Sequence, residues 1–208
     1  MGETGSRRRL HRLALWLVAG TLSYNIVEAS VAIIFGRHAE SIALVGFGLD
    51  SIIESVAASV LLWRLWRGAR RGNDSILAHL DRRVHRVVGV TFLVLAAYVL
   101  LQSAWVLASR LIPEETMVGI ALAIASVLMM PAVSIGKIRV ARRLGSPALA
   151  AEAKETIACS YLSLALLLGL VLNSLLGWWW ADPVAALLMV PWLIKEGIEG
   201  LRGECACA

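Results

Sequence analysis

The sequence has few charged residues for its length of 208: Asp, Glu, Lys and Arg make up 17% of it, against 59% hydrophobic residues. Its mean hydropathy is +0.74. A soluble domain of this size has too little interior to bury so much apolar surface. The composition therefore excludes an ordinary soluble domain and indicates a membrane protein.

The chain is also poor in cysteine, with Cys159 inside a hydrophobic run and Cys205 and Cys207 in the C-terminal tail. A disulfide framework is not expected from three cysteines placed in this way. No small-residue cleavage site follows the apolar stretch from Leu13 before Gly36, so a cleavable signal peptide is not expected either. The apolar runs are continuous rather than alternating, which excludes membrane-spanning strands.

These runs are roughly 20 residues long, the length that a helix needs to cross a hydrocarbon core of about 30 Å. We therefore predict an all-α membrane protein with six transmembrane helices. The stretch 67–85 between the second and third runs is polar and is predicted to be a solvated loop. The predicted spans cover residues 13–35, 42–66, 86–109, 116–138, 149–177 and 181–200.

The basic residues orient these spans. The N-terminus, the loops after the second and fourth spans (Lys137 included) and the C-terminal end carry 17 Lys and Arg residues, whereas the opposite loops carry only Arg37 and Arg110. This asymmetry predicts that both termini are cytoplasmic, and it accounts for the net charge of +5 without a nucleic-acid partner. The predicted organisation is a basic cytoplasmic N-terminus at 1–12, a six-helix transmembrane domain at 13–200 and a short cytoplasmic tail at 201–208.

Two predicted spans carry ionisable residues well inside the membrane, where a charge costs at least ~2.5–3.5 kcal/mol. The second span has Asp50 and Glu54, and the fifth has Glu155 and Cys159. Each pair is spaced i, i+4 and so projects from one helix face. Counted from the ends of their spans, both pairs lie near the middle of the membrane. Two helices that each give two ligands would form a four-coordinate site, the number that zinc prefers.

Such a site has a simple link to protons. Three carboxylates and a thiol brought together without a partner repel one another and take up protons, and a dication that binds them drives those protons off. Competition between metal and protons for the same ligands predicts an exchange of one against the other.

Four further polar residues are predicted to line a path to this site or to support it. Glu152 and Ser163 extend the stripe of the fifth span, and Asn25 and Glu28 share one face of the first. For Asn25, simple hydrogen bonding between helices is an open alternative.

Two other groups of residues have local interpretations. His79, Asp81 and His85 have the residue types of a second metal site, although a solvated loop is the favoured interpretation. Asp182 precedes Pro183 and is predicted to cap the sixth span at its outer end.

Three stretches resemble the cation diffusion facilitator family, which moves zinc and related divalent ions, usually in exchange for protons. SIALVGFGLDSIIESVAA resembles the family's second helix, with Asp50 and Glu54 at the two acidic positions of its DxxxD motif. RRLGSPALAAEAKETIACSYLS resembles the start of the fifth helix, with Glu155 and Cys159 at the two positions of its HxxxD or DxxxD motif. LGWWWADPVAALLM resembles the passage into the sixth helix, so the likeness covers nearly the whole chain.

The resemblance implies a secondary-active exporter of divalent metal that needs no prosthetic group. Zinc is the expected ion, with cadmium or manganese as alternatives, because Glu155 and Cys159 replace the family's usual ligands and a thiolate favours softer ions. Most members have a cytoplasmic domain that this sequence lacks, so a homodimer is expected to form through the membrane helices. The expected location is the inner (plasma) membrane of a bacterium.

Two rival functions follow from the same residues. A membrane-bound metal sensor or accessory subunit would bind metal without transporting it. An intramembrane enzyme would use Cys159 as a nucleophile, but no histidine is predicted within reach to activate the thiol. We therefore expect a protein that is not an enzyme.

Overall fold

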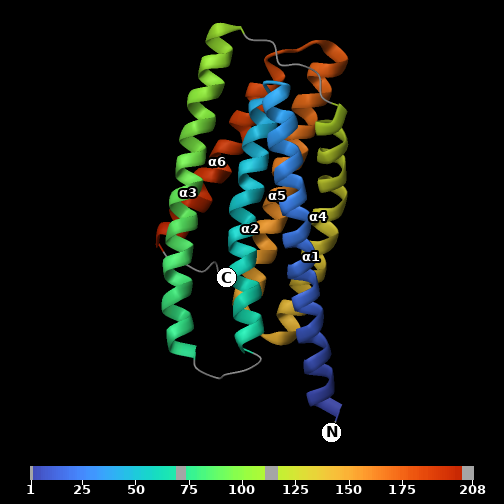
Figure 1. The fold of residues 1–208 in the computed structure, drawn as a ribbon, viewed down its shortest axis with the longest axis vertical. Coiled ribbons are helices and arrows are strands. Elements are labelled where there is room, and N and C mark those ends of the chain that lie inside the picture. The colour runs from blue at the N-terminus through green and yellow to red at the C-terminus, as the bar shows by residue number, and fades with distance from the viewer. Residues whose placement is uncertain (1, 69–73, 111–116, 203–208) are drawn as a thin grey trace.

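The computed structural model describes residues 2–68, 74–110 and 117–202, and their side chains over 8–66, 89–110 and 117–202 apart from residues 147, 151 and 158. The described residues form six helices that run antiparallel in one bundle (Figure 1). The predicted all-α class and the predicted number of helices are confirmed. The helices are α1 (Gly2–His38), α2 (Ile42–Gly68), α3 (Asp74–Ser109), α4 (Met117–Leu144), α5 (Pro147–Leu176) and α6 (Ala181–Arg202).

The outer surface of the bundle is apolar, as a lipid-facing surface must be. Leu101 and Leu128, for example, are 73% and 70% exposed. The helices α1 to α5 contain stretches long and apolar enough to cross a membrane. The remaining helix, α6, carries Lys195 and Glu196 and does not meet that criterion, yet it packs against α3 and α5 inside the bundle. Its 22 residues give a length of about 33 Å, enough to span the hydrocarbon core.

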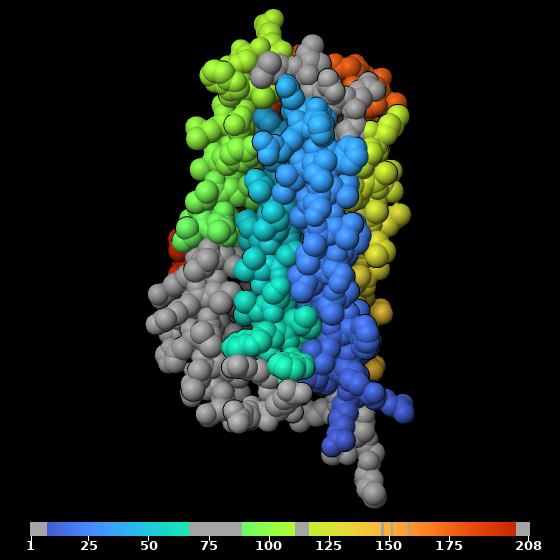
Figure 2. Space-filling view, in the orientation of Figure 1, coloured from blue at the N-terminus to red at the C-terminus, as the bar shows by residue number. Residues whose placement is uncertain are grey.

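Three helix pairs have the most extensive contacts: α1 with α2, α3 with α6, and α4 with α5 (Figure 1). Glycine residues allow the backbones of two of these pairs to come close together. A Cβ atom on Gly89 of α3 would lie 2.8 Å from the carbonyl oxygen of Gly197 in α6, and one on Gly48 of α2 would lie 2.8 Å from Ile33 of α1. Small residues at helix contacts are typical of membrane bundles, where close van der Waals packing takes the place of a hydrophobic driving force. The resulting α1–α2 face is continuous in the space-filling view (Figure 2).

Asp182 caps a different helix from the one predicted. Its fully buried carboxylate accepts hydrogen bonds from the backbone N–H groups of Ile42 (3.0 Å) and Ala43 (3.4 Å) and from the hydroxyl of Ser41. These N–H groups belong to the first turn of α2, where no earlier carbonyl is available to them. Asp182 therefore joins the start of α6 to the start of α2 at the end of the bundle opposite the N-terminus.

Two other expectations need correction. The stretch 67–85 is not all loop, because α3 begins at Asp74. Lys137 was assigned to a loop, but α4 runs on to Leu144 and buries the Lys137 side chain completely. The predicted limits of the second and fifth spans lie within two residues of α2 and α5.

Candidate metal centre

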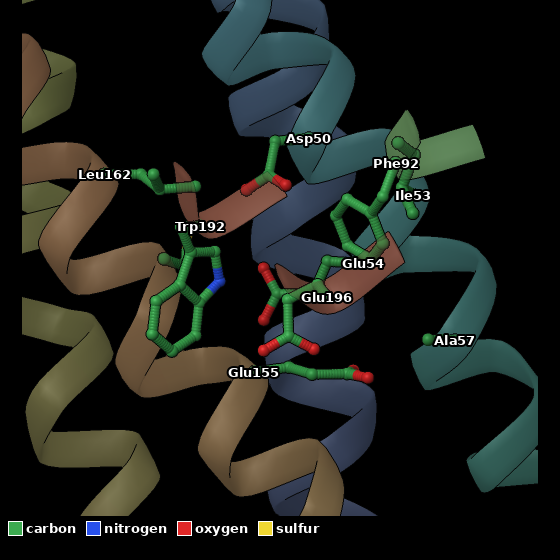
Figure 3. Close-up of a pocket in the computed structure, with 10 residues that line it drawn as sticks. Asp50, Ile53, Glu54, Ala57, Phe92, Glu155, Leu162, Trp192 and Glu196 are labelled. Carbon is green, nitrogen blue, oxygen red and sulfur yellow. The ribbon is translucent and has the colours of Figure 1, made fainter. Parts of the chain in front are cut away.

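A small cavity lies where α2, α5 and α6 meet, with one residue of α3 at its edge. It offers about 20 Å³ to the centre of a water-sized sphere, which is room for one water molecule or one small ion. Four carboxylic acids and one thiol line it, together with apolar side chains (Figure 3). The lining residues are Asp50, Ile53, Glu54, Ala57, Phe92, Glu155, Cys159, Leu162, Trp192 and Glu196.

All four predicted metal ligands line this one cavity. Helical spacing puts Asp50 and Glu54 on one face of α2, and it puts Glu155 and Cys159 on one face of α5. Asp50, Glu54 and Cys159 are 6%, 5% and 2% exposed. Two ligand pairs from distant parts of the sequence, one on α2 and one on α5, thus share one buried space inside the bundle.

Besides the four predicted ligands, the cavity contains a further carboxylic acid, Glu196, which was not assigned a role from the sequence. It lies on α6, and its carboxylate faces those of Glu54 and Glu155 (Figure 3). Glu196 lies close to the predicted end of the sixth span, where a charged residue needs no special explanation. Its one available signal was the spacing from Trp192, which puts both residues on the same helix face.

The carboxylic acids and the thiol line one cavity, but they are not arranged to coordinate a metal ion. Among the described residues, no three His, Cys, Asp or Glu side chains lie close enough together to hold a metal ion. Glu54 nevertheless has a buried carboxylate oxygen, Oε2, without a hydrogen-bond partner in the described part of the chain. An unpaired buried carboxylate oxygen is costly in a low dielectric, and a cation is the partner that satisfies it best. Side-chain rotation or helix movement would have to bring the ligands together around an ion.

A buried ion pair adjoins the cavity. The ammonium group of Lys137 on α4 lies 2.6 Å from Oε1 of Glu152 and donates a hydrogen bond of 3.0 Å to the hydroxyl of Thr156. The same hydroxyl lies 3.2 Å from Oε1 of Glu54. A chain of polar contacts therefore connects Lys137 to a residue of the cavity.

Of the predicted path residues, Glu28 and Ser163 have hydrogen-bond partners of their own, and Asn25 has none among the described residues. Glu28 is fully buried and accepts hydrogen bonds from the hydroxyls of Ser51 (2.9 Å) and Ser126. The hydroxyl of Ser163 donates to the carbonyl of Cys159, one turn earlier in the same helix, at 2.7 Å. Asn25 is fully buried, and neither atom of its amide has a partner in the part of the chain that the structure describes. None of these three residues lines the cavity.

The weaker candidate site, formed by His79, Asp81 and His85, lies outside the described side chains. The tail cysteines Cys205 and Cys207 lie outside the described residues as well.

The cavity has the chemistry of a cation site. Its carboxylates are hard oxygen ligands, its thiol is a soft ligand, and no lysine or arginine among the described side chains lines it. The family model for the cation efflux transmembrane domain matches residues 18–202. The chain belongs to the cation efflux family. Members of this family are transporters rather than enzymes, and this cation efflux protein is accordingly a multi-pass membrane protein that transports divalent cations.

The match covers all three helices that supply the acidic groups of the cavity, and it ends where α6 ends. No curated protein matches the sequence. For this cation efflux protein, the choice of ion and the means of driving transport therefore have to be argued from its own residues.

Proposed function

We propose that this protein exports divalent metal, zinc first, in exchange for protons. Asp50 and Glu54 of α2 and Glu155 and Cys159 of α5 bind the ion in the middle of the membrane. The observation that carries this proposal is that the two i, i+4 pairs, from two different helices, line the same buried cavity.

The ligand set favours zinc over harder ions. A thiolate raises the affinity for zinc and cadmium, whereas carboxylates alone would suit manganese equally well. Cys159 is therefore the residue that sets the preference. We expect the site to prefer zinc to cadmium, because three of its four proposed ligands are oxygen donors.

Protons are the natural counter-ion for this ligand set. In the absence of metal, several acids in one small buried space share protons, and a bound dication displaces them. An inward proton gradient then favours release of the metal on the outer side. The rest of the cycle is a rocking of helices that opens the cavity to each side in turn.

The proposal also covers the membrane in which the protein lies and its oligomeric state. The predicted cytoplasmic termini suit an exporter in the inner (plasma) membrane of a bacterium. A homodimer would form through the lipid-facing surfaces of the helices, where large apolar side chains are exposed.

The test is a flux measurement in liposomes that contain the purified protein. Zinc, cadmium and manganese are offered in turn, while metal movement and internal pH are followed together. The Asp50→Asn variant removes one proposed ligand charge at nearly constant volume. The control variant is Glu40→Gln, which removes an acidic charge at an exposed position in the turn between α1 and α2.

We expect zinc movement coupled to opposite proton movement, lost in Asp50→Asn and kept in Glu40→Gln. Full flux by Asp50→Asn would overturn the proposed site. Saturable zinc binding without flux of any of the three ions would instead identify a metal sensor or accessory subunit.

A further inference from the structure

The side chain of Lys137 is the feature of this bundle that the proposed function leaves unexplained. It is fully buried, next to a cavity that should attract cations, and its ammonium group is held by Glu152 at 2.6 Å. A buried charge in a membrane protein is expensive and usually marks a functional site. Interhelical attachment alone would not need a charge, because neutral polar residues serve that purpose in many membrane bundles.

The ammonium group lies one side chain away from a proposed metal ligand. It donates to the hydroxyl of Thr156 at 3.0 Å, and that hydroxyl lies 3.2 Å from Oε1 of Glu54. Thr156 and Glu152 are one helical turn apart on α5, so Lys137 is positioned between the carboxylates of Glu152 and Glu54. Each of these two carboxylates also has a buried Oε2 without a hydrogen-bond partner among the described residues.

The two carboxylates therefore compete for one ammonium group. Lysine has three donors on a flexible four-carbon stem, so rotation about that stem offers a way to move its charge from one acid to the other. In the structure Glu152 accepts a hydrogen bond from it directly, while the hydrogen-bonded connection to Glu54 runs through Thr156. Glu54 thus keeps one buried carboxylate oxygen, Oε2, without a hydrogen-bond partner among the described residues.

We propose that Lys137 is a tethered cation that competes with the metal ion for Glu54, and that Glu152 keeps it away from the site. Lys137 is then a positioning residue that sets the metal affinity, and Glu152 acts on the metal only through Lys137. The proposal rests on the proposed function, because it takes Glu54 as a metal ligand. It differs from the prediction that Glu152 itself lines the loading path, since a path residue would attract the ion directly.

The test is a double-mutant cycle read by equilibrium zinc binding to the purified protein and by the KM of zinc flux. In Glu152→Gln the ammonium group loses its holder and moves to Glu54. We expect zinc binding weaker by about tenfold, as a unit positive charge moved next to a ligand predicts. Adding Lys137→Met to this variant removes the competitor, so we expect the double variant to return to within about threefold of the wild type.

A third variant separates charge from packing. In the Glu152→Gln background, Lys137→Arg keeps the positive charge, and we expect binding to stay weak. Lys137→Met alone should bind zinc at least as tightly as the wild type, because a competitor is lost and the negative charge of Glu152 is no longer balanced by a nearby cation. Should that single variant fail to fold, the comparison of Glu152→Gln with the neutral double variant still decides the question.

Two exposed charges provide the matched controls: Arg139, on the same helix as Lys137, and Glu40, in the turn between α1 and α2. Arg139→Met and Glu40→Gln should each change zinc affinity by less than about twofold, because solvent and salt screen exposed charges.

Two results would overturn the inference while the proposed function stands. If the double variant stays as weak as Glu152→Gln, Glu152 attracts the ion directly. If neither variant changes zinc affinity but both lower thermal stability, the pair is structural. A wild type that binds no zinc, or an Asp50→Asn variant that binds it fully, would remove the proposed site and this inference with it.

Discussion

The acidic groups of the cavity outnumber the charges of a dication. Asp50, Glu54, Glu155 and Glu196 could together carry four negative charges around one small space. Carboxylates this close and this poorly solvated cannot all be ionised without a cation. The residues therefore suit a site that alternates between protons and metal.

Cys159 should decide which metal is preferred. We expect Cys159→Ser to lower the affinity for cadmium most, for zinc less and for manganese least, because the thiolate is the only soft ligand. The measurement is competitive binding of the three ions to purified protein in which Cys205 and Cys207 are also serine, so that the tail thiols do not contribute. The matched protein with Cys159 intact and the tail serines in place is the control. An equal loss for all three ions would show that Cys159 contributes volume rather than a ligand.

Glu196 should support the ion without being indispensable. We expect Glu196→Gln to weaken zinc binding by about threefold to tenfold, because a nearby negative charge is lost while the four proposed ligands remain. Asp50→Asn should abolish binding in the same assay. Complete loss of binding in Glu196→Gln would place Glu196 in the ligand set, and the site would then draw on three helices.

At the scale of the helices, glycine contacts determine how close α6 comes to the rest of the bundle. A Cβ atom on Gly89 would meet the backbone of α6 at three points, between 2.8 and 3.0 Å away. Backbone atoms cannot move aside without moving the helix, and α6 carries Glu196. The α3–α6 contact is therefore coupled to the geometry of the cavity.

We expect Gly89→Ala to lower both the thermal stability of the purified protein and its zinc flux, because the new methyl group pushes α3 and α6 apart. Gly20→Ala is the control, since a Cβ atom at Gly20 of α1 would have no neighbour within 4 Å. Alanine is also the better helix former, so the control should be neutral or slightly stabilising. Equal effects of the two substitutions would contradict a specific α3–α6 contact.

Asp182 is expected to stabilise the end of the bundle away from the N-terminus. Asp182→Ala removes the acceptor of two N–H groups of α2, and the loss of a helix cap costs about 1–2 kcal/mol. Asp182→Asn keeps a side-chain oxygen and should lose less. Thermal unfolding of the purified variants measures both effects. Equal stability of Asp182→Ala and the wild type would show that this cap does not contribute to the stability of the bundle.

The helices and their contacts also show which features could be predicted from the sequence alone and which could not. Hydropathy locates the helices, and i, i+4 spacing selects the pairs on α2 and α5, because both signals are local. Lys137 was misplaced because counting basic residues between spans cannot reveal that Glu152, 15 positions later, makes burial of an ammonium group tolerable. Asp182 was given to the wrong helix for the same reason: its partner Ile42 is 140 residues away.

At the scale of the whole molecule, transport requires that the cavity open to each side of the membrane. In the structure Cys159 is 2% exposed, so a water-soluble reagent reaches its thiol only when the helices move. The rate of thiol modification therefore reports how often the bundle opens. A metal ion bound by Cys159 should block the reaction directly.

In a variant with Cys205→Ser and Cys207→Ser, we expect a membrane-impermeant thiol reagent to modify Cys159 slowly, and saturating zinc to slow the reaction further. Adding Asp50→Asn should abolish the effect of zinc but not the slow reaction itself, because the ion is lost while the motion continues. A cysteine introduced by Glu40→Cys in a background without Cys159 is the control, and zinc should not alter its rate. Protection that persists with Asp50→Asn would mean that zinc closes the bundle from another site, and the cavity would then be a passage rather than the place where the ion is bound.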